Sequence, residues 1–260
     1  MAAPALILLA EGSNDLHVAT SYHLIRRRLQ MMRPNLEISL AFLDHCPPSG
    51  PQVVTSLANR GVTEIVFVPL SLTAAVSGGH RAAAMLARVR AAHPGIAFSV
   101  SRPVGPSVEL LNLIDEHLRA ALRAARALEL DALVLATPGD TDTRGAALLA
   151  RRARQWSGHH RLPCAVATND ATGPNTAAAI SSLRAQGRRH IAVGSMYLVR
   201  DDNYQAQAQA AASAGAVAVS APLGQDERVL ELALARYSFA AMELLDAVEL
   251  ADAAPSSLAL

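Results

Sequence analysis

The chain of 260 residues is long enough for one large domain or two ordinary ones, each with a sizeable core. Its formal net charge of +1 and its aromatic content of 3% argue against a nucleic-acid partner, which needs basic excess or stacking side chains. All 23 basic residues are Arg. The absence of Lys excludes Schiff-base lysine chemistry and a Walker-type phosphate loop.

The first residues do not predict a targeting segment. The apolar run 5–10 is short and follows no basic region, so it does not resemble a signal peptide. No stretch reaches the roughly 18 apolar residues that span a bilayer. Cys46 and Cys164 lie far apart and imply no disulfide framework. We therefore expect a cytoplasmic protein without a membrane partner.

Short apolar runs alternate with longer segments of helical periodicity through the first half of the chain. The first helix is predicted to stop before Pro34, the second at Gly61, and the third at Pro94. In chain order, the pattern predicts a strand at 6–10, a helix at 17–32, a strand at 36–43, a helix at 49–60, a strand at 63–68, a helix at 79–93, a strand at 96–101 and a helix at 107–128. This alternation is typical of a parallel sheet with helices on both faces.

The pattern then restarts. The run 6–15 parallels 133–142, Gly61 with Ile65 parallels Gly187 with Ile191, and the segment 103–105 parallels 222–224. The sequence thus predicts an α/β protein of two flavodoxin-like parallel-sheet domains that arose by internal duplication. We expect the first domain at residues 1–128, the second at 129–250 and a frayed tail at 251–260.

A flavodoxin-like strand order of 2-1-3-4 makes the first and third strands neighbours at the point where ligands bind. The first strand is followed by Glu11, and the third by the loop 71–79 and then His80. We expect Glu11 and His80 to face each other. A carboxylate and an imidazole suit a borderline divalent metal and also proton transfer. The alternatives are an acid that caps a helix dipole and an ordinary surface histidine.

Other polar residues are predicted near the same edge. Asp44 and His45 follow the second strand and can reach the crevice, or can form only a polar turn. The backbone N–H groups of Gly12 and Ser13, before a helix, can receive an anionic group. His159 and His160, at the end of a later helix, are predicted to form a solvated turn.

The second half lacks the equivalent motifs. The segment 137–140 stands where Glu11 and its followers stand in the first half, and no Gly-Gly-His follows the third strand of the second half. This asymmetry predicts one active half and one half that serves as a wall. Arg200 and Tyr204 can still line a shared cleft.

These motifs resemble the sirohydrochlorin chelatase family, the small class II tetrapyrrole chelatases that insert cobalt or ferrous iron. The likeness rests on the strand followed by Gly12-Ser13, on Ala41-Phe42-Leu43-Asp44 with Pro47-Pro48-Ser49, and above all on Val68-Pro69-Leu70-x-Leu72 with Gly79-His80. It covers nearly all of the first half and, more faintly, the second. The layout in two halves is similar to the double-length members and to ferrochelatase.

The resemblance implies the site residues. His80 matches the second motif His of the family, whereas Glu11 stands where the family has its first His. His80 and Glu11 are then the catalytic and metal-binding residues. Ser13, Asp44, His45, Gly79, Arg81 and Arg200 are expected to bind the substrate, a polycarboxylate that Arg can clamp in a bidentate manner.

The implied reaction is the ATP-independent insertion of a divalent metal, Co²⁺ or Fe²⁺, into a sirohydrochlorin-type tetrapyrrole, with no organic cofactor. A side chain takes protons from the pyrrole nitrogens as the metal enters. One alternative is a non-catalytic carrier of metal or tetrapyrrole, and another is a different chemistry on the same fold. A monomer and a homodimer both remain open, because the two halves can supply the pairing that shorter relatives obtain by dimerising.

Overall fold

The computed structural model describes residues 3–73, 79–139, 143–169 and 173–253, with residues 79–81 and 250–253 described in backbone only. The first half contains β1 (Ala5–Ala10), α1 (Leu16–Met32), β2 (Ile38–Phe42), α2 (Gly50–Ala58), β3 (Glu64–Pro69), α3 (Gly79–Ala92), β4 (Ala97–Val100) and α4 (Glu109–Ala124). The second contains β5 (Ala132–Thr137), α5 (Thr143–His160), β6 (Cys164–Thr168), α6 (Thr176–Ala185), β7 (Ile191–Ser195), α7 (Asp202–Ser213), β8 (Ala218–Val219) and α8 (Glu227–Ala253).

The first sheet is parallel, with the order β2-β1-β3-β4 that the sequence predicts. Its two central strands, β1 and β3, are almost continuously apolar and buried, as expected for strands covered on both faces. Leu9 pairs with Pro69 at their carboxyl ends, so the loops that follow leave the same edge side by side.

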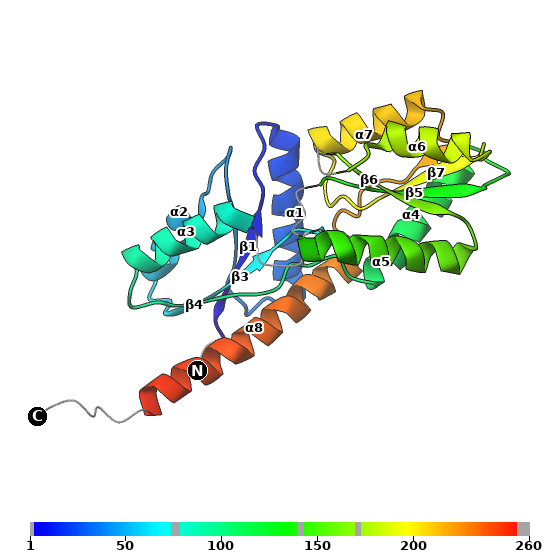
Figure 1. Cartoon of the computed structure of the whole chain (residues 1–260). Helices are drawn as coiled ribbons and strands as arrows, with labels where there is room; N and C mark the ends of the chain where they lie inside the picture. The colour runs from blue at the N-terminus through cyan, green and yellow to red at the C-terminus, as the bar shows by residue number, and fades with distance from the viewer. Residues whose placement is uncertain (1–2, 74–78, 140–142, 170–172, 254–260) are drawn as a thin grey trace, which may run out of the picture.

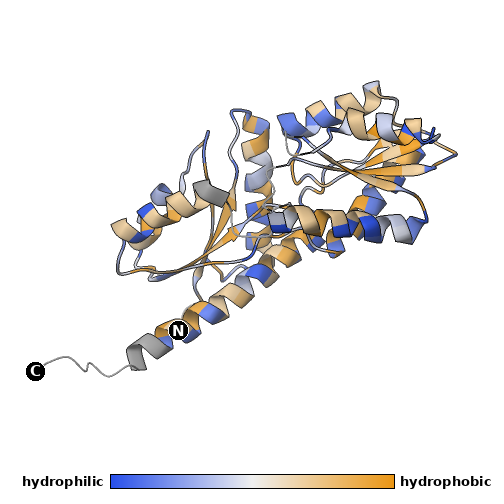
Figure 2. Cartoon of the chain, viewed as in Figure 1, coloured by the Kyte–Doolittle hydropathy of each residue, from blue (hydrophilic) through white to orange (hydrophobic). Residues whose placement is uncertain are grey.

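The second sheet repeats this arrangement, with the parallel order β6-β5-β7-β8. The predicted fold class of two flavodoxin-like sheets is confirmed, and the identical strand order supports the duplication. Figure 1 shows the two sheets as separate bodies that lie next to each other, with α1 on the side of the first sheet that faces the second domain. Figure 2 shows that apolar residues concentrate in the strands of both sheets.

The last helix of each half crosses to the other half. Helix α4 packs against β7 and β8 of the second sheet, whereas α8 packs against β3 and β4 of the first. Figure 1 shows α8 running from the second domain beneath the first sheet. The domain ranges 1–128 and 129–250 stay a prediction about the repeat along the sequence. In the structure, α4 and α8 each pack on the sheet of the other half. Of the predicted tail, residues 251–253 belong to α8, and residues 254–260 lie outside the described part of the chain.

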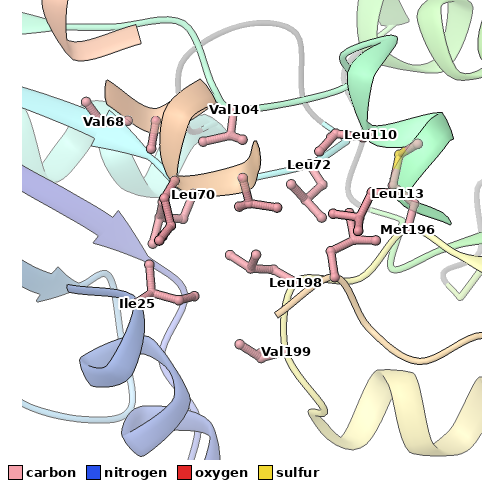
Figure 3. Close-up of a cluster of buried hydrophobic side chains, with 14 of the residues drawn as sticks. Ile25, Val68, Leu70, Leu72, Val104, Leu110, Leu113, Met196, Leu198 and Val199 are labelled. Atoms are coloured by element: carbon pink, nitrogen blue, oxygen red, sulfur yellow. The ribbon is translucent and has the colours of Figure 1, made fainter. Parts of the chain in front are cut away.

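One buried apolar cluster extends through both units. Leu70 and Leu72, which follow β3, share it with α4 and with Met196 and Leu198, which follow β7. Figure 3 shows these side chains converging from the two domains, with Val199 directed toward the α1 side of the cluster. Side chains of the two sheets therefore pack in one continuous core, which fixes the loops at the facing sheet edges.

In the part of the chain that the structure describes, no helix combines the length and apolarity needed to cross a bilayer.

Candidate metal and tetrapyrrole site

The loops after β1, β2 and β3 meet at one edge of the first sheet. The amide of Leu43 donates to the carbonyl of Ala10 at 3.0 Å, and the amide of Leu70 donates to the carbonyl of Leu9 at 2.8 Å. Glu11 therefore begins a loop that lies between the loops following β2 and β3. Its side chain is exposed. Glu11 thus lies at the carboxyl ends of the strands, where the sequence places it, and its contact with a ligand stays a prediction.

Asp44 and Gly12 join the first two of these loops directly. The Gly12 amide donates to Oδ1 of Asp44 at 3.0 Å. A Cβ atom on Gly12 would lie only 1.8 Å from the Asp44 carbonyl oxygen, so only glycine fits this approach. The Gly12 amide, predicted as a donor for an anionic ligand, thus already serves a carboxylate of the protein itself.

His45 and Ser13 lie at the same edge. His45 Nε2 is 3.6 Å from Oδ2 of Asp44, and about half of the His45 side chain is exposed. Its φ of 57° places it in the left-handed region, which is uncommon for a residue other than glycine. The Ser13 hydroxyl accepts from the Asp15 amide at 3.0 Å, and Asp15 caps α1. Both residues are therefore part of tight local turns beside Glu11.

His80, Gly79 and Arg81 form the first turn of α3, directly after the loop that follows β3. Their side chains, and all of residues 74–78, lie outside the described part of the structure. The predicted pairing of Glu11 with His80 therefore stays a prediction. Within the described residues, no group of three or more His, Cys, Asp or Glu side chains is arranged to hold a metal ion.

The second domain faces this edge with the loops after β5 and β7. The Thr73 hydroxyl, after β3, donates to the carbonyl of Gly139, after β5, at 3.2 Å in a buried position. This hydrogen bond joins the two sheet edges. Arg200 is exposed and stacks over the Tyr204 ring, with its guanidinium carbon 5.0 Å from the ring centroid.

Tyr204 itself does not line a cleft, contrary to expectation. Its side chain is buried, and its hydroxyl donates to the carbonyl of Ser220 at 3.0 Å. The Tyr204 ring packs in the core, and its hydroxyl, the one polar atom of the side chain, is hydrogen-bonded to the backbone. Arg200 above it is the part of this pair that reaches solvent.

Tyr22 and Asp201 are two further residues of this region that the sequence did not single out. Burial raises the pKa of the Tyr22 hydroxyl, and the negative charges of Asp201 and Glu11 raise that pKa further. Burial also raises the pKa of Asp201. The pKa of Tyr22, on α1, is therefore raised by the charge of one carboxylate from each domain. Asp201 stands directly before helix α7 as its N-cap residue.

The expectation about His160 is also wrong. His160 does not form a solvated turn, because its Nε2 lies 2.6 Å from Oδ1 of Asp115 and its ring packs edge-on against Trp156. Asp115 on α4 is buried and also pairs with Arg119. A buried carboxylate needs such partners, so this cluster binds α4 to α5 and belongs to the core.

Comparison with known proteins assigns the first domain. Residues 5–121 match the family model CbiX. Among curated proteins, no significant match is found. The structure is similar to SirB from Bacillus subtilis with Fe³⁺, at 18% identity over 92% of this chain and 96% of that one, with a TM-score of 0.74.

Two other solved structures share the fold. The sirohydrochlorin chelatase SirB from Bacillus subtilis subspecies spizizenii, in complex with cobalt, is 16% identical over 94% of this chain and 97% of that chain, with a TM-score of 0.75. DR2241 from Deinococcus radiodurans, a multi-domain protein with structural similarity to chelatases, is 17% identical over 92% and 55%, with a TM-score of 0.58. At these identities the structures establish the fold, and the family model carries the assignment of residues 5–121. Residues 5–121 thus match the CbiX family, and the whole chain has the fold of the sirohydrochlorin chelatase SirB.

Proposed function

We propose that this protein inserts a divalent metal ion, Co²⁺ or Fe²⁺, into a sirohydrochlorin-type tetrapyrrole. The observation that carries this proposal is the meeting of the β1, β2 and β3 loops at one sheet edge, within a segment that matches the CbiX family. The facing loops of the second domain form the opposite wall. The macrocycle binds between these two edges, with its ring nitrogens toward Glu11.

The reaction needs a base and a metal ligand, but no nucleotide. Two N–H bonds of the macrocycle break, four metal–nitrogen bonds form, and two protons leave as the metal ion enters. We assign His80 as metal ligand or proton acceptor and Glu11 as its partner. Carboxylates are ionised at neutral pH and can accept a proton or hold a divalent ion.

Asp44 has a positioning role in this proposal. Its carboxylate holds the Gly12 amide, which fixes the backbone beside Glu11. Ser13 and His45 complete the surface of the two turns, and Gly79 and Arg81 flank His80. Arg200 projects from the opposite wall and pairs with an acidic arm of the substrate. We place this activity in the cytoplasm, in keeping with the free thiols of Cys46 and Cys164.

Absorbance spectroscopy tests the proposal directly. Sirohydrochlorin is mixed with Co²⁺ or Fe²⁺ with and without the protein, and formation of the metallated product is followed. We expect the wild-type protein to accelerate insertion over the metal-only blank. The His80→Ala and Glu11→Ala variants should each lose at least 100-fold in rate, the typical contribution of a proton-transfer group.

The control is His93→Ala, which removes the histidine directly after the far end of α3 and should keep the wild-type rate. Failure of the wild-type protein to exceed the blank contradicts the enzyme assignment. Tight macrocycle binding without insertion identifies the protein as a carrier instead. Full activity of Glu11→Ala contradicts the site assignment alone. Glu11→His restores the family motif, and a changed metal preference in this variant would assign that preference to residue 11.

A further inference from the structure

A polar cavity lies where the chain crosses from the first domain to the second. Its volume is about 300 Å³. It is bounded by the crossover segment 102–109 between β4 and α4, by the first half of α5, and by α8. The charged residues among its described lining are Arg102, Glu109, Arg144, Arg152 and Arg236.

Positive charge dominates this cavity. Four guanidinium groups face one carboxylate, that of Glu109. A hydrogen bond from the Ser107 hydroxyl lowers the pKa of Glu109, and the charges of Arg152 and Arg236 act in the same direction. Glu109 is therefore ionised at neutral pH. One negative charge still leaves an excess of three positive charges among the described lining residues.

Two of the arginines are tied to the protein backbone. Arg152 donates to the carbonyl of Pro106 through Nε and Nη2, both at 3.4 Å. Arg236 donates from Nε to the carbonyl of Pro103 at 3.0 Å. Neutral carbonyls orient these guanidinium groups without cancelling their charge. Burial lowers the pKa of Arg152, so its charged form is held here at a cost that a nearby anion would offset.

The other two arginines have open donors. Arg102 follows β4, and Arg144 stands in the first turn of α5. Both are exposed at the mouth of the cavity. Among the residues that the structure describes, neither guanidinium has a hydrogen bond or an ion pair. The two guanidinium groups come from different elements and line the same cavity. They can therefore bind one anion from two directions.

We propose that this crossover cavity binds a small oxyanion with carboxylate or phosphate chemistry, held by Arg102 and Arg144 in the field of Arg152 and Arg236. A volume of about 300 Å³ is at the lower end of small-molecule sites, so it admits a small anion and not a whole macrocycle. The anion is either free in solution or an acidic arm of a larger ligand. Its binding joins α5 to the crossover segment.

Direct binding to the full chain tests this proposal without reference to metal insertion. Inorganic phosphate and citrate are titrated into the protein by calorimetry at constant ionic strength, with chloride as the comparison anion. We expect saturable binding and a higher unfolding temperature with phosphate or citrate. The double variant Arg102→Gln/Arg144→Gln should weaken that binding at least 10-fold.

The matched control is Arg151→Gln/Arg154→Gln. It removes the same charge from two exposed positions of α5, the helix that carries Arg144. This variant should bind phosphate as the wild-type protein does. Absence of saturable binding to wild type overturns the proposal. Equal loss in both double variants also overturns it, because net charge alone would then explain the binding.

A competition arm identifies the source of the anion. Sirohydrochlorin binding is measured with and without saturating phosphate. Competition, with weaker macrocycle binding in Arg102→Gln/Arg144→Gln, assigns the cavity to an acidic arm of the substrate. Simultaneous binding of phosphate and macrocycle assigns it to a free anion. A protein that binds phosphate here but inserts no metal would refute the proposed function and leave this site in place.

Discussion

At the scale of single residues, the contact between Gly12 and Asp44 is the feature that organises the candidate site. It joins the loops after β1 and β2 through one hydrogen bond and one close backbone approach. Glu11, whose carboxylate is exposed, directly precedes Gly12 in the chain. Under the proposed function, a metal ion or macrocycle would therefore meet a loop whose shape Asp44 sets before the ligand arrives.

The substitution Gly12→Ala tests this contact. The added Cβ would fall 1.8 Å from the Asp44 carbonyl oxygen, so the two loops must separate. We expect a loss of about 1–3 kcal/mol in the free energy of unfolding, as for an overpacked site, and a loss of metal-insertion rate. Urea denaturation measures the first effect and the absorbance assay the second.

Gly158→Ala is the control for this substitution. Gly158 lies in helix α5, and a Cβ there meets nothing within 4 Å. Gly158 lies in the last turn of α5, so alanine there should raise the free energy of unfolding by no more than about 1 kcal/mol. Equal stability effects at the two glycines would contradict the close approach at Gly12.

The sequence predicts the placement of some site residues and not of others. Glu11 and Asp44 could be placed because the carboxyl ends of parallel strands share one sheet edge. Tyr22 and Asp201 could not, because their proximity depends on how the second domain packs against α1. The solvated turn predicted at His160 was wrong for a similar reason, since its partner Asp115 lies on another helix.

At the scale of elements, helix α7 begins at a carboxylate that the domain interface partly buries. Asp201 is the N-cap residue of α7, and its Oδ1 accepts from the Tyr204 amide at 2.7 Å. Burial nevertheless raises its pKa above the ordinary 3.8. The folded protein therefore holds a proton on Asp201 at pH values where the unfolded chain has already lost it.

This raised pKa predicts a pH-dependent effect of Asp201→Asn. Asp201 favours the folded state most at pH below 3.8, and this contribution is lost as the pH rises through the raised folded value. Asparagine keeps the cap and cannot ionise. We expect the variant to gain stability relative to wild type as the pH rises from 3.5 to 7, measured by urea denaturation.

The exposed neighbour Asp202 supplies the control. Asp202→Asn removes the same charge from the first turn of the same helix. A change in relative stability of similar size in this variant would show that charge near the helix start, and not burial of Asp201, causes the effect.

The elements themselves follow closely from the sequence, because hydrophobic periodicity is a local property. The predicted strand at 63–68 is observed at Glu64–Pro69, and the predicted helix at 17–32 at Leu16–Met32. The partner of each last helix was not predictable. The apolar faces of α4 and α8 suit either sheet, and only the three-dimensional packing decides that each covers the sheet of the other half.

At the scale of the whole molecule, the apolar cluster shared by both domains should make unfolding a single event. Leu198 belongs to the second domain and packs in the same cluster as Leu70 and Leu72 of the first. We expect Leu198→Ala to lower the free energy of unfolding by about 2–5 kcal/mol, as for a large truncation in a core. Calorimetry should show one transition at a lower temperature.

Leu128→Ala is the matched control, because this leucine is 97% exposed. Its effect should stay within about 0.5 kcal/mol. Two separate transitions, of which only one moves in Leu198→Ala, would contradict a shared core. Hydrogen exchange of β1 and β5 amides adds a local measure, because both strands should lose protection together.

The exchanged helix α8 has a consequence for how the chain is made. A ribosome adds roughly 5–20 residues per second, and most domains fold as they emerge. Here β3 and β4 emerge early, whereas residues 227–253, which cover them, are made long after these strands. One apolar face of the nascent first sheet therefore stays uncovered until α8 has been synthesised, and the sheet is closed only then.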